Sequence, residues 1–169
     1  MNSEHRIGID IGRVIIAGDQ PGGDTSFIGG SMDEVLRTPA IPGALAAIAR
    51  LHTLFAGRVW LISKCGRRVE ERSRVWLLHH RFHEQTGVPE EHLRFCRERP
   101  QKRDHAVELG LTHFVDDRTD VLAHLAGVVP HLFLFGPQNE PVPSFATHVA
   151  TWDEAEEAIA ATLALTPCG

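Results

Sequence analysis

The sequence predicts an α/β protein with a three-layer, Rossmann-like fold, in which a mainly parallel sheet of five to six strands has helices on both faces. Short apolar runs alternate along the chain with segments of helical periodicity, a pattern typical of repeated strand–helix–strand units. The 169 residues fit one domain, 1–169, and 43% of them are apolar. A chain of this size can bury a core without disulfides or a structural metal.

Five apolar runs are expected to form the strands. They are rich in Val, Ile, Leu and Phe and are bounded by glycine, proline or polar residues, which is typical of buried parallel strands. Polar residues stand at three of their ends: Asp10 after the first run, Ser63 after the second, and the pair Asp116-Asp117 after the fourth. In chain order, the expected strands are 7–9, 59–62, 93–96, 113–115 and 131–135.

The segments between these runs have apolar residues at helical spacing and recognisable ends. Pro42 and Pro100 stand where helices begin, because the fixed φ of proline suits the first helical position. Gly110 is expected to end the helix before it, and Thr151 with Glu154 forms a capping box at the start of the last helix. The first helix is expected to begin at 42. The others are expected, in chain order, at 67–84, 100–109, 119–126 and 151 to about 165.

Residues 12–40 have no sustained apolar pattern. The pairs Gly22-Gly23 and Gly29-Gly30 are loop signals, and only the segment 33–36 resembles a short turn of helix. We therefore expect a flap over about 12–40, close to the tip of the first strand.

Composition and charge exclude several classes of protein. The net charge is −5, from 17 basic and 22 acidic residues, so a nucleic-acid polymer is not expected as a partner. Cys65, Cys96 and Cys168 form neither an even set nor a C-x-x-C pair, which predicts free thiols in a reducing compartment. No apolar run approaches the length of a membrane span, and no signal peptide is visible. We expect a cytoplasmic chain without a membrane partner.

The polar residues at the strand ends carry the functional prediction. Ligands of parallel sheets bind beyond the carboxyl ends of the strands, so Asp10, Ser63 and the Asp116-Asp117 pair can meet there although they are far apart in sequence. Each one alone has an ordinary explanation, as a turn residue or a helix cap. Two adjacent carboxylates repel each other unless a cation lies between them, and this favours a metal site.

In this order, the residues resemble the motifs of the haloacid dehalogenase superfamily of phosphohydrolases. The matching segments are GIDIGRVI, VWLISKCG, PQKRDHAVELGL and HFVDDRTDVL, and together they span the whole chain. The segment between the first two motifs is similar to that of family members without a large cap domain. GLTHFVDDRTDVL is also similar to the nucleotidase-like branches.

The resemblance implies an Mg²⁺-dependent phosphatase-like hydrolase of a small phosphorylated metabolite, with nucleotides among the candidates. Asp10 would be the nucleophile that forms an aspartyl-phosphate, and Lys102 would neutralise charge that develops on the phosphoryl group. The residues implied to bind phosphate are Ser63, Lys64, Arg13 and Lys102, and those implied to hold Mg²⁺ are Asp10, the backbone carbonyl of Gly12, Asp116 and Asp117.

Gly12 departs from the family pattern. Phosphatases of the family usually have a second Asp two residues after the nucleophile, where it acts as the general acid. A positioned general acid contributes about 10²–10⁴-fold in rate, and Arg13 cannot replace it because a guanidinium is too weak an acid. The alternative function is therefore a catalytically impaired regulatory module that binds phosphate and metal.

Two further classes of protein share part of this residue set. A response-regulator receiver also uses acids, a Ser or Thr and a Lys, but its acidic pair follows the first strand, whereas Asp116-Asp117 follows the fourth. A true dehalogenase would share the nucleophile Asp10 and need no Mg²⁺. A homo-oligomer is a further alternative, since a partner subunit could supply the substrate specificity that a cap domain gives.

Overall fold

The computed structural model describes residues 5–18 and 30–164, and these form a six-stranded sheet. Its strands are β1 (Ile7–Ile9), β2 (Val59–Lys64), β3 (Leu93–Cys96), β4 (His113–Asp116), β5 (His131–Phe135) and β6 (Thr147–Val149). Their order across the sheet is β3-β2-β1-β4-β5-β6, and each neighbouring pair is parallel. The predicted α/β fold with a mainly parallel sheet is confirmed.

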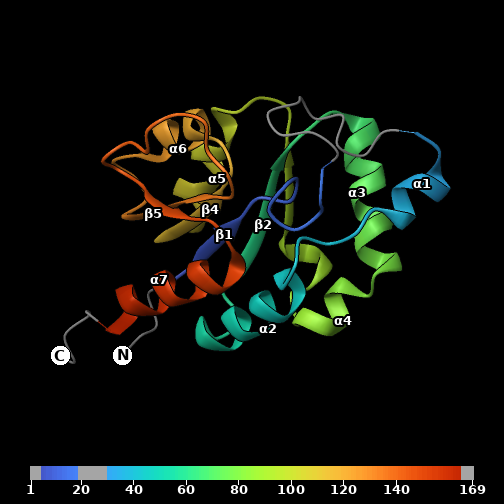
Figure 1. Ribbon diagram of the computed structural model, residues 1–169, viewed down its shortest axis with the longest axis horizontal. Helices are drawn as coiled ribbons and strands as arrows, with labels where there is room; N and C mark the ends of the chain where they lie inside the picture. The colour runs from blue at the N-terminus through green and yellow to red at the C-terminus, as the bar shows by residue number, and fades with distance from the viewer. Residues whose placement is uncertain (1–4, 19–29, 165–169) are drawn as a thin grey trace.

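Helices cover both faces of the sheet and complete three layers (Figure 1). One face is covered by α5 and α6, and the other by α2, α3, α4 and α7, while α1 packs against α3. The helices are α1 (Met32–Arg37), α2 (Ala44–Leu54), α3 (Arg67–His79), α4 (Phe82–Thr86), α5 (Gln101–Leu109), α6 (Thr119–Leu125) and α7 (Trp152–Ala164). Within the described residues, no helix has the length and apolar character needed to cross a membrane.

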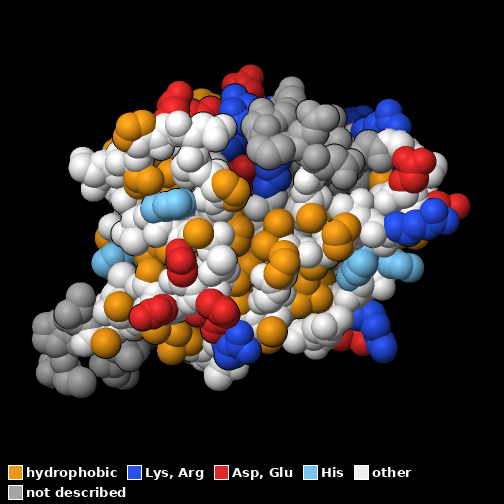
Figure 2. All heavy atoms as spheres, viewed as in Figure 1, with side chains coloured by type: hydrophobic (Ala, Val, Ile, Leu, Met, Phe, Trp, Pro, Cys, Tyr) orange, Lys and Arg blue, Asp and Glu red, His pale blue; other side chains and the backbone are white. Residues whose placement is uncertain are grey.

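Successive strand residues enter two separate apolar cores, because side chains alternate between the faces of a strand. On β4, Phe114 packs in the core beneath α5 and α6, and Val115 packs in the core beneath α2 and α7. The helices correspondingly bury one side against a core and expose the other. α7 buries Trp152 and Ile159, and Figure 2 shows acidic side chains over its outer side.

Gly8 of β1 is required by this packing. A Cβ at this position would lie 2.7 Å from Leu111 Cδ1 and 2.7 Å from Phe114 Cε2, well inside van der Waals contact. The absent side chain therefore lets the helix-covered core close over the strand that ends at Asp10.

Several predicted elements have different bounds in the structure, and two of these differences are larger than a shift of one residue at a helix end or affect a site residue. β2 continues through Lys64, because Ser63 and Lys64 pair with Phe95 and Cys96 of β3; Ser63 therefore lies within the strand and not after it. The helix predicted from 67 to 84 is interrupted after His79, since Arg81 has a left-handed backbone with φ 55°. Both corrections concern elements next to the predicted site.

The ends of the predicted flap are packed against the domain. The expected helical turn at 33–36 is present as α1, and residues 19–29 lie outside the described part of the chain. Arg72 donates to the Gly30 carbonyl at 2.7 Å and Trp76 donates to the Thr38 carbonyl at 2.8 Å. These two bonds attach the returning limb of the flap to α3.

Candidate active site

The predicted site residues converge at one edge of the sheet. β1 is the central neighbour of β2 and β4, so the carboxyl ends of all three strands lie side by side. Asp10 follows β1 directly and donates its backbone N–H to the Val115 carbonyl of β4 at 3.0 Å. Asp116 is the last residue of β4. The expectation that these distant segments meet is confirmed.

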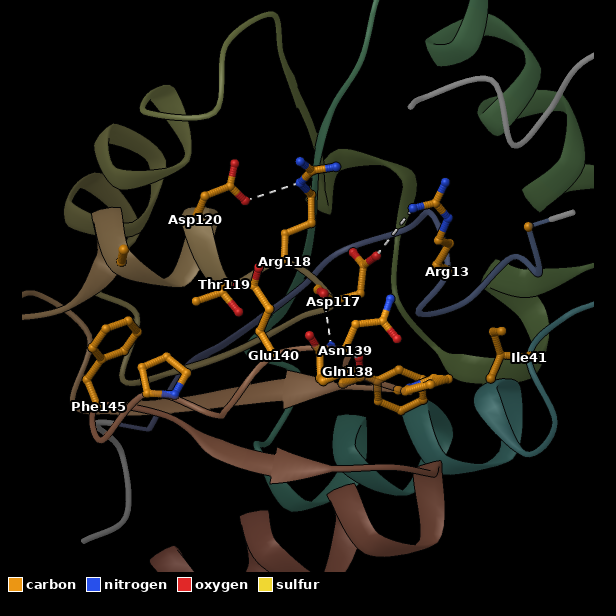
Figure 3. A pocket seen from close by; sticks show the side chains of 16 residues that line it. Arg13, Ile41, Asp117, Arg118, Thr119, Asp120, Gln138, Asn139, Glu140 and Phe145 are labelled. Atoms are coloured by element: carbon orange, nitrogen blue, oxygen red, sulfur yellow. Dashed lines mark hydrogen bonds and ion pairs between the residues drawn. The ribbon is translucent and has the colours of Figure 1, made fainter. Parts of the chain in front are cut away.

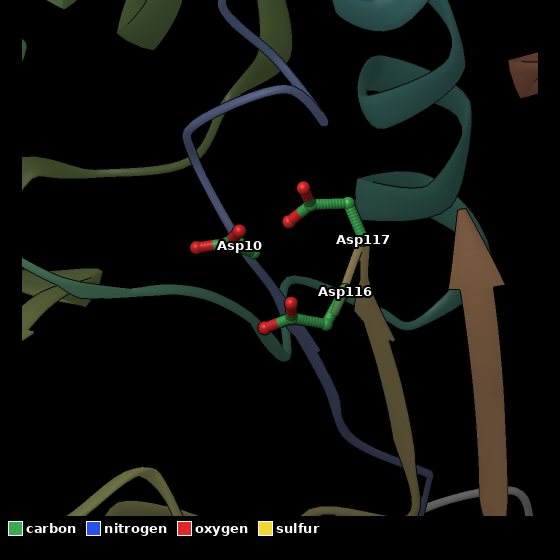
Figure 4. A group of neighbouring side chains, drawn as sticks. All are labelled: Asp10, Asp116 and Asp117. Carbon is green, nitrogen blue, oxygen red and sulfur yellow. The ribbon is translucent and has the colours of Figure 1, made fainter. Parts of the chain in front are cut away.

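The three carboxyl groups of Asp10, Asp116 and Asp117 lie together (Figure 4), each with an oxygen within 4.8 Å of the others. Around an octahedral Mg²⁺, opposite oxygens are about 4.2 Å apart and adjacent oxygens about 3 Å apart. Since at most one pair among three ligands can be opposite, the carboxylates would have to approach one another by up to about 2 Å to bind one ion. Gly12, the other predicted ligand, forms an isolated bridge with Ile16, and its role stays a prediction.

Lys102 joins two of these acids from the other side. It comes from the first turn of α5, is 2% exposed, and its Nζ donates to Asp10 Oδ1 at 2.9 Å and to Asp116 Oδ2 at 2.7 Å. Burial by itself would lower the pKa of Lys102, but the two carboxylates raise that pKa above its ordinary value. The lysine is thus a permanent buried cation inside the cluster.

The cluster carries more negative than positive charge. Burial, followed by the charges of Asp116 and Asp10, raises the pKa of Asp117 to about 9. Burial and the charge of Asp10 raise the pKa of Asp116 to about 6, against the effect of Lys102. Arg13 lies beside Asp117, with NH1 3.9 Å from Asp117 Oδ2. Since the carboxylates resist ionisation together, a divalent cation is the species that would stabilise them.

Three of the predicted phosphate-binding residues come from the end of β2 and from the segment after β1. Ser63 is 3% exposed, and Lys64 is half-buried at the last position of β2. Because they are successive residues of one strand, their side chains leave on opposite faces. Arg13 has a left-handed backbone with φ 61° and directs its guanidinium toward Asp117 (Figure 3). The phosphate-binding roles of all three stay predictions.

Solved structures share this arrangement of sheet and helices. D,D-heptose 1,7-bisphosphate phosphatase from B. bronchiseptica, in complex with magnesium and phosphate, superposes with a TM-score of 0.69 over 94% of this chain and 99% of its own, at 20% identity. The chain has the haloacid dehalogenase-like fold. A haloacid dehalogenase-like hydrolase from Burkholderia xenovorans LB400 superposes with a TM-score of 0.62 over 94% of this chain and 99% of its own, at 14% identity.

A third haloacid dehalogenase-like hydrolase, from Xanthomonas campestris, gives a TM-score of 0.62 over 93% of this chain and 95% of its own, at 11% identity. No family model and no curated protein sequence matches the chain. At these identities the likeness is one of fold.

Sequence reasoning missed the segment that follows β5. Gln138 donates its side-chain amide to the Asp117 carbonyl at 3.2 Å and to the Phe135 carbonyl at 3.1 Å, so it supports the backbone of the acid pair. Gly136-Pro137, directly after a predicted strand, was the signal that could have found it. The same reasoning that selected Asp10 could have selected this strand end too.

A cavity of about 790 Å³ opens between this segment and Asp117 (Figure 3). Asp117 and Arg13 are part of its wall, so it adjoins the predicted phosphoryl site. The remaining lining residues come mainly from the start of α6 and from segment 135–145, together with Gly18 and Ile41.

Proposed function

We propose that the chain is an Mg²⁺-dependent phosphatase-like hydrolase of a small phosphorylated metabolite. One observation carries the proposal: Asp10, Asp116 and Asp117 converge at the strand ends with more negative charge than their one buried lysine neutralises. The fold supports it, because a structural neighbour is a phosphatase in complex with magnesium and phosphate.

The donor set fits Mg²⁺. Asp10, Asp116 and Asp117, with the Gly12 carbonyl, would hold the ion through oxygen atoms, which are the ligands that Mg²⁺ prefers. When bound, the ion supplies the positive charge that lets a phosphoryl group approach a carboxylate.

Asp10 would act as the nucleophile. Lys102 holds Asp10 Oδ1, which leaves Oδ2 to form a bond to phosphorus while the bond from phosphorus to the leaving oxygen breaks. Water then attacks the aspartyl-phosphate, and inorganic phosphate leaves as the Asp10 carboxylate is restored. Ser63 and Arg13 would hold the phosphoryl oxygens during both steps, whereas the side chain of Lys64 leaves β2 on the face opposite to Ser63.

Gly12 determines how the leaving oxygen obtains its proton. Without a carboxylic acid at this position, the proton has to come from water or from a group outside the motif. Aryl phosphates, whose leaving groups need no protonation, are therefore expected to react faster than alkyl phosphates. Gly12 also favours the second candidate function, a regulatory module that binds phosphate and metal without turnover.

Release of inorganic phosphate tests the proposal. p-Nitrophenyl phosphate and a panel of phosphorylated metabolites would be incubated with the wild type, Asp10→Asn, and Asp153→Asn as a control on the exposed side of α7. We expect Mg²⁺-dependent release by the wild type and the control, and none by Asp10→Asn. Release that does not depend on Asp10 would reject the mechanism.

Calorimetry separates the two candidates if no release occurs. Tight binding of phosphate in the presence of Mg²⁺ without turnover would support the regulatory module. Appearance of activity in Gly12→Asp would then show that only the general acid is missing.

A further inference from the structure

The cavity beside Asp117 is larger than a phosphoryl group requires. Its volume of about 790 Å³ lies in the range of sites that bind whole metabolites or cofactors. Inorganic phosphate or a three-carbon phosphate would leave most of it filled with water. The cavity therefore has room for a leaving group of nucleoside size.

One wall of the cavity is held in place at both ends. After β5, the Gly136 backbone donates to the Val149 carbonyl at 2.9 Å, and His148 Nε2 bonds the Gly136 carbonyl at 2.7 Å. Further on, Val142 and Ala146 pack against the core beneath α5 and α6. The wall 136–145 is thus pre-organised, and this lowers the cost of binding a ligand.

The wall carries an exposed aromatic side chain, Phe145. It is 39% exposed although it is a large aromatic residue, and it lies at one side of the cavity, with Arg13 and Ile41 at the other (Figure 3). Of the large apolar side chains that are exposed in the described part of the chain, Phe145 is the one that lines this cavity. An exposed ring there can stack on a flat apolar group of a ligand.

The polar side chains of the cavity indicate how many phosphates the ligand carries. Arg13 lies beside Asp117 at the phosphoryl end. Arg118 also lines the cavity, and its Nε donates to Asp120 Oδ1 at 3.2 Å, so these two charges are paired. Glu140 adds a further carboxylate to the lining, and a carboxylate accepts hydrogen bonds from hydroxyl groups but repels a second phosphate. The lining therefore suits a monoester with a hydroxylated, uncharged leaving group.

We propose that the cavity between α6 and segment 136–145 binds the leaving group of a phosphomonoester of nucleoside size, with Phe145 stacking on its flat end. This inference rests on the proposed function, because it places the phosphoryl group at Asp10. It makes Phe145 a specificity-determining residue and separates this chain from an enzyme that takes a bisphosphate.

Calorimetry on Asp10→Asn in Mg²⁺, with adenosine 5′-monophosphate, ribose 5-phosphate and inorganic phosphate as probes, tests the inference. We expect the nucleotide to bind at least about five-fold more tightly than ribose 5-phosphate, a ratio that corresponds to the lower range of base stacking on an aromatic ring. Phe145→Ala is expected to remove this difference in affinity. Phe145→Trp should keep the difference in affinity, because the new side chain can also stack. Leu78→Ala, which truncates an exposed apolar side chain on α3, should leave both affinities unchanged.

The outcomes distinguish the inference from the function on which it rests. If inorganic phosphate does not bind to the wild type in Mg²⁺, the proposed function fails, and the leaving-group site fails with it. If phosphate binds but Phe145→Ala leaves the nucleotide affinity unchanged, or ribose 1,5-bisphosphate binds more tightly than ribose 5-phosphate, only the leaving-group site is overturned. Should Asp10→Asn not fold, the ratio of kcat/KM for the nucleotide and ribose 5-phosphate, measured on the wild type and Phe145→Ala, gives the same decision.

Discussion

Replacing Lys102 by methionine is expected to destabilise the folded chain by about 3–5 kcal/mol at pH 8, the cost of removing one partner from a buried ion pair. Methionine keeps most of the length of the side chain, so the main change is the loss of charge. The ammonium lies 2.9 Å from Asp10 Oδ1 and 2.7 Å from Asp116 Oδ2. Its removal leaves two buried carboxylates without their cation.

The size of the loss should depend on pH in a defined direction. Without the lysine, burial and the charge of Asp10 hold the folded-state pKa of Asp116 above the ordinary value of 3.8. A group with a raised folded-state pKa keeps its contribution below its unfolded pKa and loses it as the pH rises through the folded value. The difference between variant and wild type is therefore expected to be small near pH 4 and largest near pH 8.

Urea unfolding followed by tryptophan fluorescence measures this difference. Lys64→Met is the matched control, because Lys64 is the other lysine of the chain and is half-buried at the end of β2; we expect it to cost less than about 1 kcal/mol. For a chain of this length, the predicted loss in Lys102→Met corresponds to a decrease in Tm of roughly 6–20 °C. A loss below about 1 kcal/mol at pH 8, or an equal loss at pH 4 and pH 8, would refute the reasoning.

Three further predictions concern the same framework. Asp117→Asn should stabilise the chain by about 1–3 kcal/mol at pH 8 without Mg²⁺ and reduce stabilisation by Mg²⁺, because the pKa of Asp117 is raised to about 9 and its ionisation opposes folding. Gly8→Ala should cost about 1–3 kcal/mol in urea unfolding, since its Cβ would lie 2.7 Å from Phe114. His113→Gln should reduce acid sensitivity: burial, then His131, lowers the pKa of His113 to about 3. The unfolded chain therefore takes up this proton first, and wild-type stability falls from about pH 6.5 toward pH 3.

Controls for these variants are present in the chain. Gly66→Ala, where a Cβ would meet nothing within 4 Å, should change the free energy of unfolding by less than about 1 kcal/mol. If Gly8→Ala cost no more than Gly66→Ala, the packing argument for Gly8 would be contradicted. His124→Gln, at an exposed position of α6, should leave the acid unfolding curve unchanged. An acid curve of His113→Gln identical to that of the wild type would show that another group takes up the proton. Equal stabilisation of Asp117→Asn and the wild type by Mg²⁺ would remove Asp117 from the ligands.

The fold could be predicted largely because buried parallel strands appear in the sequence as apolar runs. The strands at 7–9, 93–96 and 131–135 have the predicted bounds, and those at 7–9 and 131–135 are buried along almost their whole length. β6 was not among the predicted strands, because Thr147-His148-Val149 is short and mostly polar and pairs at the sheet edge with β5 alone. The helix break at Arg81 was also missed, because a left-handed arginine has no local signal of the kind that glycine gives.

The sequence predicted that the acids can meet, because parallel strands bring their carboxyl ends to one edge of the sheet. Asp10 and the Asp116-Asp117 pair do meet because β1 and β4 are neighbours, an order that the sequence did not predict. The leaving-group cavity was not predictable in the same way. It depends on the conformation of segment 136–145 and on the two bonds of Gln138, which follow from contacts between distant loops.

A crystal structure of the chain with Mg²⁺ and BeF₃⁻, which imitates a phosphoryl group bonded to a carboxylate, tests the central claim most directly. We predict that beryllium bonds to an oxygen of Asp10, that Mg²⁺ lies between Asp10 and the Asp116-Asp117 pair, and that Lys102 and Ser63 contact the fluorines. Beryllium bonded to a different carboxylate, or Mg²⁺ bound away from these acids, would contradict the assignment of Asp10 as the nucleophile.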